Sequence, residues 1–289
     1  MTDVRRETMR EPITPASLAM LEERGEPIVM VTAYDFNSAS VAEAAGVDVV
    51  LVGDSAAMTM LGYQSTRLVS LEEMLMLTRA VRRGITRPLL VGDLPYGSYE
   101  ASNAAALETA RRFIEVGCGA VKLEGGTPDR VERVRALIAA GIPVMGHVGL
   151  LPQSTGIGEA YQVQGKTADQ AIRMLEEAKA LELAGCFAIV IEAIPAAVSE
   201  LLVPRIGVPV IGIGAGPATD GQVLVFDDLV GLAAGKPAKF VKRYAEIRTD
   251  LIEAIDSFSR DVRARRYPSA AQSYGIDSGE LATLRQRLS

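Results

Sequence analysis

The chain has 289 residues, of which 48% are hydrophobic, and its formal net charge is −6. The acidic balance excludes broad nucleic-acid binding, and no apolar stretch reaches the ~20 residues that a membrane span needs. Residues 1–7 lack the apolar core of a secretory signal. We therefore expect a cytoplasmic protein that acts on small molecules, with neither a membrane nor a nucleic acid as partner.

The chain opens with a polar segment, residues 1–27, in which a short helix is predicted over 15–24. Short apolar runs then alternate with helical patterns, as in repeated βα units. Strands are predicted over residues 28–32, 49–53, 89–93, 120–124, 143–147, 187–192, 208–213 and 222–227. Helices are predicted over residues 36–45, 70–83, 101–116, 128–140, 168–184, 195–202 and 239–263.

The spacing of the strand ends indicates the fold class. Successive ends lie about 32 residues apart on average, which is about one-eighth of a ~250-residue barrel. We predict an α/β fold, a (βα)₈ TIM barrel, over residues 28–263, followed by a charged tail or interface helix over 264–289. A doubly wound open sheet is also compatible, because periodicity does not reveal whether a sheet closes.

Histidine and cysteine are scarce, which restricts the kind of metal site. His147 is the one histidine, and Cys118 and Cys186 are the only cysteines. A structural zinc site takes four nitrogen or sulfur ligands, which these residues cannot supply. Each cysteine follows a glycine and leads into an apolar run, as small buried thiols of a reducing compartment do. Any metal is therefore expected on oxygen ligands, which favours Mg²⁺ or Mn²⁺.

Acidic residues close four of the predicted strands: Asp54, Asp93, Glu124 and Glu192. The carboxyl ends of parallel strands meet at one end of a barrel, so these side chains are expected to converge there. Asp54 and Asp93 could share a divalent cation, with Glu124 in its shell, or each aspartate could merely cap the following helix. Lys122 shares a strand face with Glu124, because residues two apart point the same way.

Three further residues carry candidate chemistry. Glu192 follows an apolar strand, where loss of solvation favours its neutral form and suits it to accept a proton near neutral pH. A salt bridge at the barrel mouth is the alternative. His147 also ends a strand and could donate a hydrogen bond to a bound oxyanion or serve the structure alone. Ser55, next to Asp54, offers a hydroxyl and a backbone N–H.

Ordered motifs along the chain carry a resemblance to one family. They occupy residues 31–35, 51–55, 93–95, 122–126, 146–150, 152–154, 163–165, 210–216 and 219–222. From about residue 17 to residue 244 the sequence resembles the ketopantoate hydroxymethyltransferases. It departs from their usual pattern at Gln162, at Arg67-Leu68 and at Asp227-Asp228, which concerns loop and folate contacts.

The resemblance implies a barrel of the phosphoenolpyruvate-mutase-like group and a homo-oligomer, usually a decamer. It also implies a hydroxymethyl transferase that moves a one-carbon unit from 5,10-methylenetetrahydrofolate to 3-methyl-2-oxobutanoate. The product would be 2-dehydropantoate, used in pantothenate and coenzyme A synthesis.

Matched by motif, Asp54 and Asp93 would hold Mg²⁺ with Glu124 in its sphere, and Glu192 would accept the proton. Two more of the residues named above, Ser55 and Lys122, would receive the oxo acid together with the backbone around Asp93. This set suits the chemistry, because removing a proton beside a ketone needs a base and a cation that stabilises the enolate oxygen.

Two other functions remain open from the sequence. Another Mg²⁺-dependent 2-oxo-acid lyase or mutase of the same superfamily would need a nucleophilic cysteine in a mobile barrel loop. Neither Cys118 nor Cys186 stands in such a loop. A non-catalytic barrel that binds an oxo acid is the other alternative, and a turnover assay would separate it from an enzyme.

Overall fold

Eight parallel strands form one closed barrel in the computed structural model, which describes residues 11–289. The strands pair in chain order, and β1 closes the ring by pairing with β8. The first ten residues of the predicted segment 1–27 lie outside the described residues. The strands are β1 (Ile28–Thr32), β2 (Val49–Val52), β3 (Leu89–Asp93), β4 (Ala120–Lys122), β5 (Val144–Gly149), β6 (Ala188–Glu192), β7 (Val210–Ile213) and β8 (Gly221–Leu224). The predicted (βα)₈ barrel is confirmed, and the open sheet is wrong.

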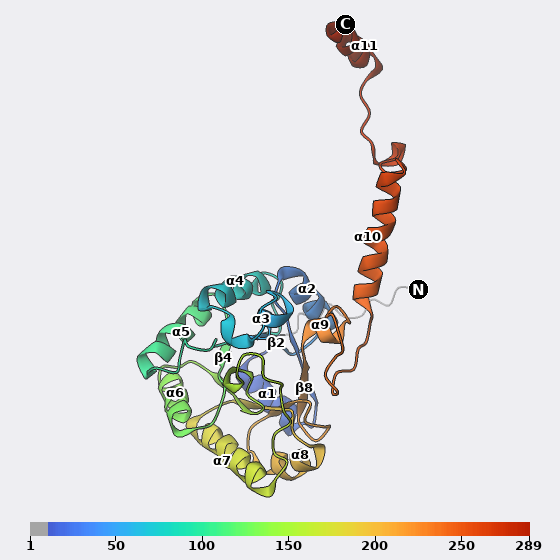
Figure 1. The fold of residues 1–289 in the computed structure, drawn as a ribbon. Coiled ribbons are helices and arrows are strands. Elements are labelled where there is room, and N and C mark those ends of the chain that lie inside the picture. Colours follow the sequence, from blue (N-terminus) through green and yellow to red (C-terminus); the bar gives the residue numbers. More distant parts are fainter. Residues whose placement is uncertain (1–10) are drawn as a thin grey trace.

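Helices surround the strands, as Figure 1 shows in a view down the barrel. Those of the ring are α2 (Phe36–Ala45), α4 (Leu71–Arg82), α5 (Asn103–Glu115), α6 (Pro128–Ala139), α7 (Ala168–Ala184) and α8 (Ala196–Leu202). The shorter elements are α3 (Ala56–Thr59), α9 (Phe226–Leu229) and the 3₁₀ turns η1 (Thr66–Leu68), η2 (Pro152–Ser154), η3 (Val203–Arg205) and η4 (Ala270–Gln272). Ser70 and Glu73 form a capping box at the start of α4.

Both faces of the strands from β2 to β7 are buried, which explains their continuous apolar runs, whereas β1 and β8 each have one exposed residue. In β2, Val49 and Leu51 belong to the cluster inside the barrel, whereas Val50 and Val52 pack against the surrounding helices. A sheet surface covered on both sides requires apolar residues at every position, so no polar alternation survives. The period of two is nevertheless kept by which cluster each residue joins.

Helix α1 (Pro15–Glu23) closes the barrel at the N-terminal end of its strands. Its fully buried Leu18 belongs to the interior cluster, and Ile13 and Leu21 pack against the same cluster. Figure 1 shows α1 across the centre of the ring. One end of the barrel interior is therefore sealed by apolar side chains.

The last predicted elements differ from the structure. The strand predicted over 222–227 ends at Leu224, and Asp227 lies in α9. The helix predicted over 239–263 begins only at Ile247. The backbone before it returns to α9 instead, where the Tyr244 N–H donates to the carbonyl oxygen of Leu229. This hydrogen bond to α9 replaces an intrahelical hydrogen bond that the predicted helix required.

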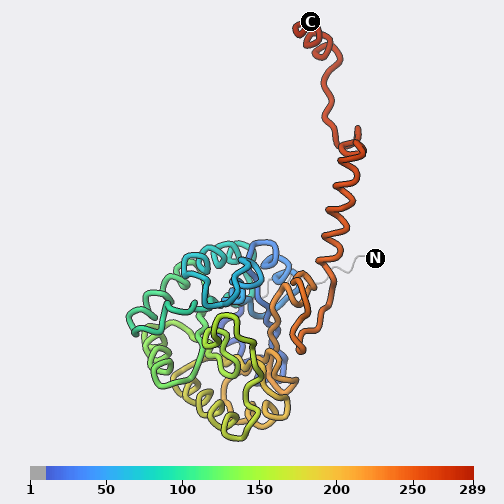
Figure 2. Tube along the Cα trace, viewed as in Figure 1, coloured from blue at the N-terminus to red at the C-terminus, as the bar shows by residue number. Residues whose placement is uncertain are grey.

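The C-terminal arm, residues 247–289, leaves the barrel (Figure 2). It consists of α10 (Ile247–Arg263), η4 and α11 (Ser278–Leu288). Neither helix has a buried residue, although the barrel was predicted to extend to residue 263. Within residues 11–289, no helix has the length and apolar character to cross a membrane.

Candidate active site

Inward-facing side chains change from apolar to charged near the C-terminal end of four neighbouring strands. Residues two apart share a face, and the first member of each pair below belongs to the barrel interior. The pairs are Val91 and Asp93, Ala120 and Lys122, Met145 and His147, and Val190 and Glu192. The charged members, with Asp54 just after β2, lie at the end opposite α1, which we call the mouth.

Asp93 binds both Asp54 and Lys122. The Lys122 Nζ donates to the two carboxylate oxygens of Asp93, each at 2.7 Å. The backbone N–H of Asp54 donates to Asp93 Oδ2 at 3.2 Å. All three side chains are at most 6% exposed, so this ion pair is held away from water. The structure thus brings the two aspartates together, as their positions after β2 and in β3 predict.

A second group joins Glu124, His147 and Glu192. The Nδ1 atom of His147 lies 3.6 Å from Glu124 Oε1, and its Nε2 lies 3.3 Å from Glu192 Oε2. His147 is buried, whereas the Glu192 side chain is 17% exposed. Glu192 therefore joins the other acids only through the imidazole, and it is the mouth carboxylate with the most access to solvent.

Gly149 lets the chain leave β5 beside Glu192. Its φ of +98° lies in the left-handed region, and a Cβ there would meet the Glu192 carbonyl oxygen at 2.3 Å. The next N–H, of Leu150, donates to that carbonyl oxygen at 2.9 Å. This close approach begins the loop of residues 150–165, which crosses the mouth.

Ser55 lies beside a tyrosine that the sequence reasoning missed. The Tyr34 hydroxyl and Ser55 Oγ are 2.7 Å apart, and Tyr34 is fully buried two residues after the end of β1. Burial raises the pKa of Tyr34 to about 12, so its hydroxyl keeps its proton. The signal in the sequence is weak, because a tyrosine after a strand is equally typical of an ordinary core.

Gln153 and Tyr99 were also missed. Gln153 Nε2 donates to Asp54 Oδ2 at 3.0 Å, and its backbone N–H donates to Glu124 Oε2 at the same distance. The Tyr99 hydroxyl donates to Gln153 Oε1 at 2.8 Å. Gln153 stands in η2 within an irregular loop, where no periodicity could show that it is buried.

The mouth carries more negative than positive charge, and the titration of its groups reflects this. Burial, and then Asp93 and Glu124, raise the pKa of Asp54 to about 8. Burial alone would lower the pKa of His147, but Glu124 and Glu192 outweigh it and raise that pKa to about 9. Burial likewise opposes the charged form of Lys122, yet the neighbouring acids raise its pKa above the usual value.

The donor set fits a hard divalent cation. As the side chains stand, residues 11–289 include no group of three His, Cys, Asp or Glu spaced to hold a metal ion, and Lys122 lies on Asp93. Three carboxylates nevertheless converge, and in the described part of the chain Glu124 Oε1 is buried with no hydrogen-bond partner. Carboxylate oxygens suit Mg²⁺ and Mn²⁺, and buried acids are costly without compensating positive charge.

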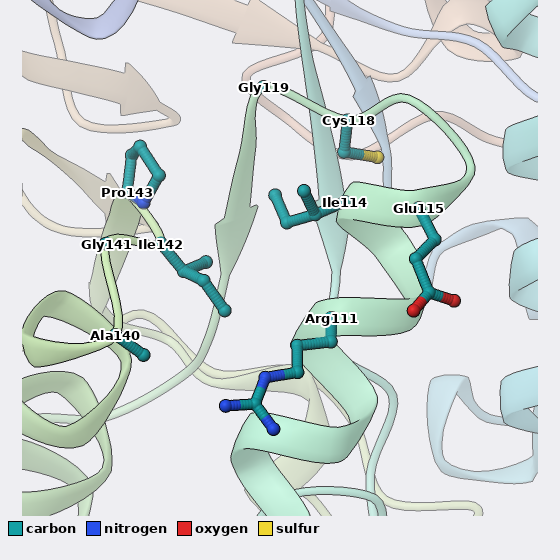
Figure 3. Close-up of a pocket in the computed structure, with 9 residues that line it drawn as sticks. All are labelled: Arg111, Ile114, Glu115, Cys118, Gly119, Ala140, Gly141, Ile142 and Pro143. Carbon is teal, nitrogen blue, oxygen red and sulfur yellow. The ribbon is translucent and has the colours of Figure 1, made fainter.

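Both thiols lie at the other end of the barrel. Cys118 and Cys186 are buried just before β4 and β6, and burial raises the pKa of each to about 12. Cys118 borders a pocket of about 450 Å³ near the N-terminal ends of β4 and β5, between Arg111 of α5 and Pro143 (Figure 3). Neither thiol can act as the loop nucleophile that the lyase or mutase alternative needs.

Comparison with known proteins agrees with this arrangement. The family model of ketopantoate hydroxymethyltransferase matches residues 12–270. The chain is similar to two proteins named 3-methyl-2-oxobutanoate hydroxymethyltransferase. The one from Deinococcus radiodurans is 50% identical over 88% of this chain and 90% of that protein. The one from Geobacillus kaustophilus is 46% identical over 91% of this chain and 95% of that protein.

A solved structure supports the fold alone. Phosphoenolpyruvate phosphomutase from Streptomyces platensis subsp. rosaceus superposes with a TM-score of 0.59 over 95% of this chain and 96% of that one. The two sequences are 15% identical, so the structural similarity supports the barrel fold and does not assign the chemistry. The predicted phosphoenolpyruvate-mutase-like barrel is confirmed.

Proposed function

The chain belongs to the ketopantoate hydroxymethyltransferase family, and from that premise we propose how its barrel mouth carries the reaction. The protein is a transferase that adds a hydroxymethyl group to 3-methyl-2-oxobutanoate, giving 2-dehydropantoate in pantothenate synthesis. The one-carbon donor in the proposal is 5,10-methylenetetrahydrofolate, and the location is the cytoplasm, which suits two free thiols.

In the proposal, the oxo acid binds at the mouth by its carboxylate and the neighbouring keto oxygen. Among the residues that the structure describes, Lys122 is the lysine buried among these acids. Its ammonium donates to Asp93 at 2.7 Å and receives the substrate carboxylate. The Ser55 hydroxyl and backbone N–H receive a second oxygen, and Tyr34 holds that hydroxyl at 2.7 Å. A buried cation offsets the repulsion that an anion would meet beside three carboxylates.

Asp54, Asp93 and Glu124 would hold Mg²⁺, with Mn²⁺ as a substitute. Two observations support this assignment. Carboxylate oxygens are the ligands that such cations prefer, and among the described residues Glu124 Oε1 is buried without a hydrogen-bond partner. When bound, the cation supplies a Lewis acid that polarises the substrate carbonyl. Lys122 and the cation would share Asp93 as a partner. The substrate carboxylate offers the Lys122 ammonium an alternative acceptor when Asp93 binds the cation.

Glu192 is the proposed base. The observation that carries this is its position, because it ends the inward stripe of β6 and is 17% exposed while the other mouth acids are buried. It accepts the proton from the third carbon of the oxo acid, and the resulting carbon nucleophile bonds to the one-carbon unit of the donor. Both C–N bonds that hold this unit to the folate break, and a water molecule supplies the oxygen of the new hydroxyl group. The proton taken by Glu192 and one from that water go to the two folate nitrogens, so that tetrahydrofolate leaves. His147 Nε2, 3.3 Å from Glu192 Oε2, orients the carboxylate.

Proton exchange tests the base directly. With Mg²⁺ and the oxo acid in D₂O, wild-type protein should exchange the proton on the third carbon, and Glu192→Gln should slow this at least ~100-fold. Calorimetry should find the oxo acid bound to the variant with an affinity within about threefold of wild type. Unchanged exchange would remove Glu192 as the base, and a wild type that exchanges without ever forming 2-dehydropantoate would refute the transfer.

A pocket beside the mouth supports the folate co-substrate. It measures about 190 Å³ and lies between the segment after β2 and the loop of residues 150–165, with Met58 and Tyr161 in its lining. Burial raises the pKa of Tyr161 to about 12, and the nearby Asp54 and Glu192 act in the same direction. We expect Tyr161→Ala to raise the KM for the folate about tenfold while proton exchange without folate stays unchanged.

The C-terminal arm supports the proposed homo-oligomer. Leu251, Ile255, Phe258 and Val262 recur at helical spacing on α10 and are all 44–67% exposed. An exposed apolar stripe of this kind marks a protein interface. We propose that it packs on a second copy of the chain, within the decamer that the family resemblance implies.

Introducing a charge into the apolar stripe of α10 tests this assembly. Ile255→Glu should lower the mass measured by light scattering after gel filtration, because it places a carboxylate inside the proposed interface. Glu253→Lys lies on the opposite helical face and serves as the matched control, with the mass of wild type. A mass unchanged by Ile255→Glu would place the interface elsewhere.

A further inference from the structure

Gln153 bonds to two of the carboxylates assigned to the cation. Its side-chain Nε2 donates to Asp54 Oδ2 at 3.0 Å, and its backbone N–H donates to Glu124 Oε2 at 3.0 Å. The same Nε2 also donates to the carbonyl oxygen of Leu94 at 3.0 Å. One residue, 3% exposed, therefore ties the acid after β2 to the acid after β4.

Tyr99 fixes which way the Gln153 amide points. The hydroxyl of Tyr99 donates to Gln153 Oε1 at 2.8 Å, while the Nε2 faces only acceptors, Asp54 and the Leu94 carbonyl. The flipped amide would place its oxygen against those two acceptors and its NH₂ against a hydroxyl that already accepts the backbone N–H of Glu124 at 3.4 Å. Only the observed orientation of the amide therefore satisfies every group. The Tyr99 ring is held in turn by Arg130, whose guanidinium carbon lies 4.9 Å from the ring centroid.

From these contacts we propose that Gln153 is a positioning residue, which holds Asp54 and Glu124 at the separation that their divalent cation requires. The inference rests on the proposed function, because it assigns those two acids to the cation. Gln153 stands in η2, inside the loop of residues 150–165 that leaves β5 beside Glu192. The order of that loop is therefore coupled to the geometry of the cation site. Removing a residue that hydrogen-bonds to the ligands of a metal typically lowers the affinity for that metal 10–100-fold.

Metal binding without turnover tests the proposal. Mn²⁺ is titrated into metal-free protein, and free Mn²⁺ is read from its electron paramagnetic resonance signal. Gln153→Met keeps the length of the side chain and the backbone N–H but loses the amide, so we expect Mn²⁺ affinity to fall about 10–100-fold. Gln162→Met, the same change at an exposed position of the same loop, should leave Mn²⁺ affinity within about twofold of wild type.

Tyr99→Phe provides a variant that keeps the aromatic ring and removes the hydrogen bond to Gln153. It should weaken Mn²⁺ binding about fivefold. The double variant Gln153→Met/Tyr99→Phe should bind Mn²⁺ with an affinity within about twofold of Gln153→Met alone, because Tyr99 acts chiefly through the amide. Its one other contact with the cation site is the long hydrogen bond, 3.4 Å, that its hydroxyl accepts from the backbone N–H of Glu124. A merely structural role predicts lower melting temperatures with unchanged Mn²⁺ affinity in both variants.

The outcomes separate the two proposals. Wild-type affinity in Gln153→Met, or in Tyr99→Phe if the first variant does not fold, overturns the role of Gln153. Fully additive losses overturn the action of Tyr99 through the amide. A wild-type protein that neither binds Mn²⁺ nor exchanges the oxo-acid proton overturns the proposed function itself, with the role of Gln153 as a consequence.

Discussion

The two ends of the barrel interior differ in what their side chains are selected to do. The interior away from the mouth, which we call the floor, is lined by fully buried apolar side chains such as Leu18 of α1 and Ile211 of β7. At the mouth, the same inward stripes end on charged groups, and His147 has neither ring nitrogen in a well-formed hydrogen bond among the described residues. The floor contributes stability, whereas the mouth costs stability that bound ligands can restore. This contrast predicts opposite responses to substitution.

The largest effect is expected from removing the one lysine of the mouth. Lys122→Met leaves Asp93 buried without its cation, and breaking a buried ion pair from one side costs about 3–5 kcal/mol. Urea unfolding of metal-free protein at pH 7 measures this loss. The matched control is Lys179→Met, whose ammonium is 41% exposed beside Glu182 and should change stability by less than about 1 kcal/mol. Equal losses would mean that burial at the mouth is not what makes Lys122 matter.

A substitution at the floor should separate stability from activity. Ile211→Ala removes a fully buried interior side chain and should lower the free energy of unfolding by about 3 kcal/mol. Because Ile211 is none of the charged mouth residues and pairs with Val190, two positions before Glu192, kcat at 20 °C should stay within about twofold of wild type. Urea unfolding and a turnover assay on the same preparation check both statements. A tenfold loss of kcat with the fold intact would show that the floor also shapes the site.

Much of this contrast was accessible from the sequence. Apolar runs that stop on an acid predicted the strands and the end at which Asp54, Asp93 and Glu124 converge, because strand period and parallel order fix both. Closure of the barrel was not accessible from periodicity and required β1 to meet β8. The end of the eighth strand was predicted at residue 227, whereas β8 ends at Leu224, because α9 begins at Phe226 within the same run.

The residues that order the site were harder to predict. Gln153 belongs to an irregular loop, and its importance comes from contacts with residues 29 and 99 positions away in the chain. Propensity and periodicity describe local structure and carry no information about such pairs. The arm is a similar case, because the pattern of α10 predicts an apolar face but not which surface covers it.

A neutral residue at the mouth should stabilise the metal-free protein. Burial and the nearby Asp93 raise the pKa of Asp54 to about 8, so the folded state disfavours its charge. Asp54→Asn keeps an oxygen that can accept from Gln153 and removes that cost, and we expect a gain of about 2 kcal/mol at pH 8. Mn²⁺ affinity should fall at least ~100-fold in the same variant. A loss of stability comparable to that of Lys122→Met would contradict the contrast between the two ends.

The most gradual expected effect is the pH dependence of the metal-free protein, and its sign follows from two groups. The pKa of Asp54 is raised from 3.8 to about 8, and that of His147 from 6.5 to about 9. Both groups keep protons in the folded state that the unfolded chain releases. Stability therefore falls as pH rises through this range.

Between pH 6.5 and 8 each group contributes about 1.5 kcal/mol, and we expect a combined loss of about 3 kcal/mol in urea unfolding. From pH 8 to 9 His147 contributes alone, and Asp54→Asn should flatten the lower part of the curve while leaving the upper part. Saturating Mn²⁺ should reverse the trend, because the cation competes with protons for the carboxylates and binds more tightly at higher pH. A metal-free protein that gains stability from pH 6.5 to 8 would show that the mouth acids are relaxed without a cation, and the two ends of the barrel would then no longer differ in kind.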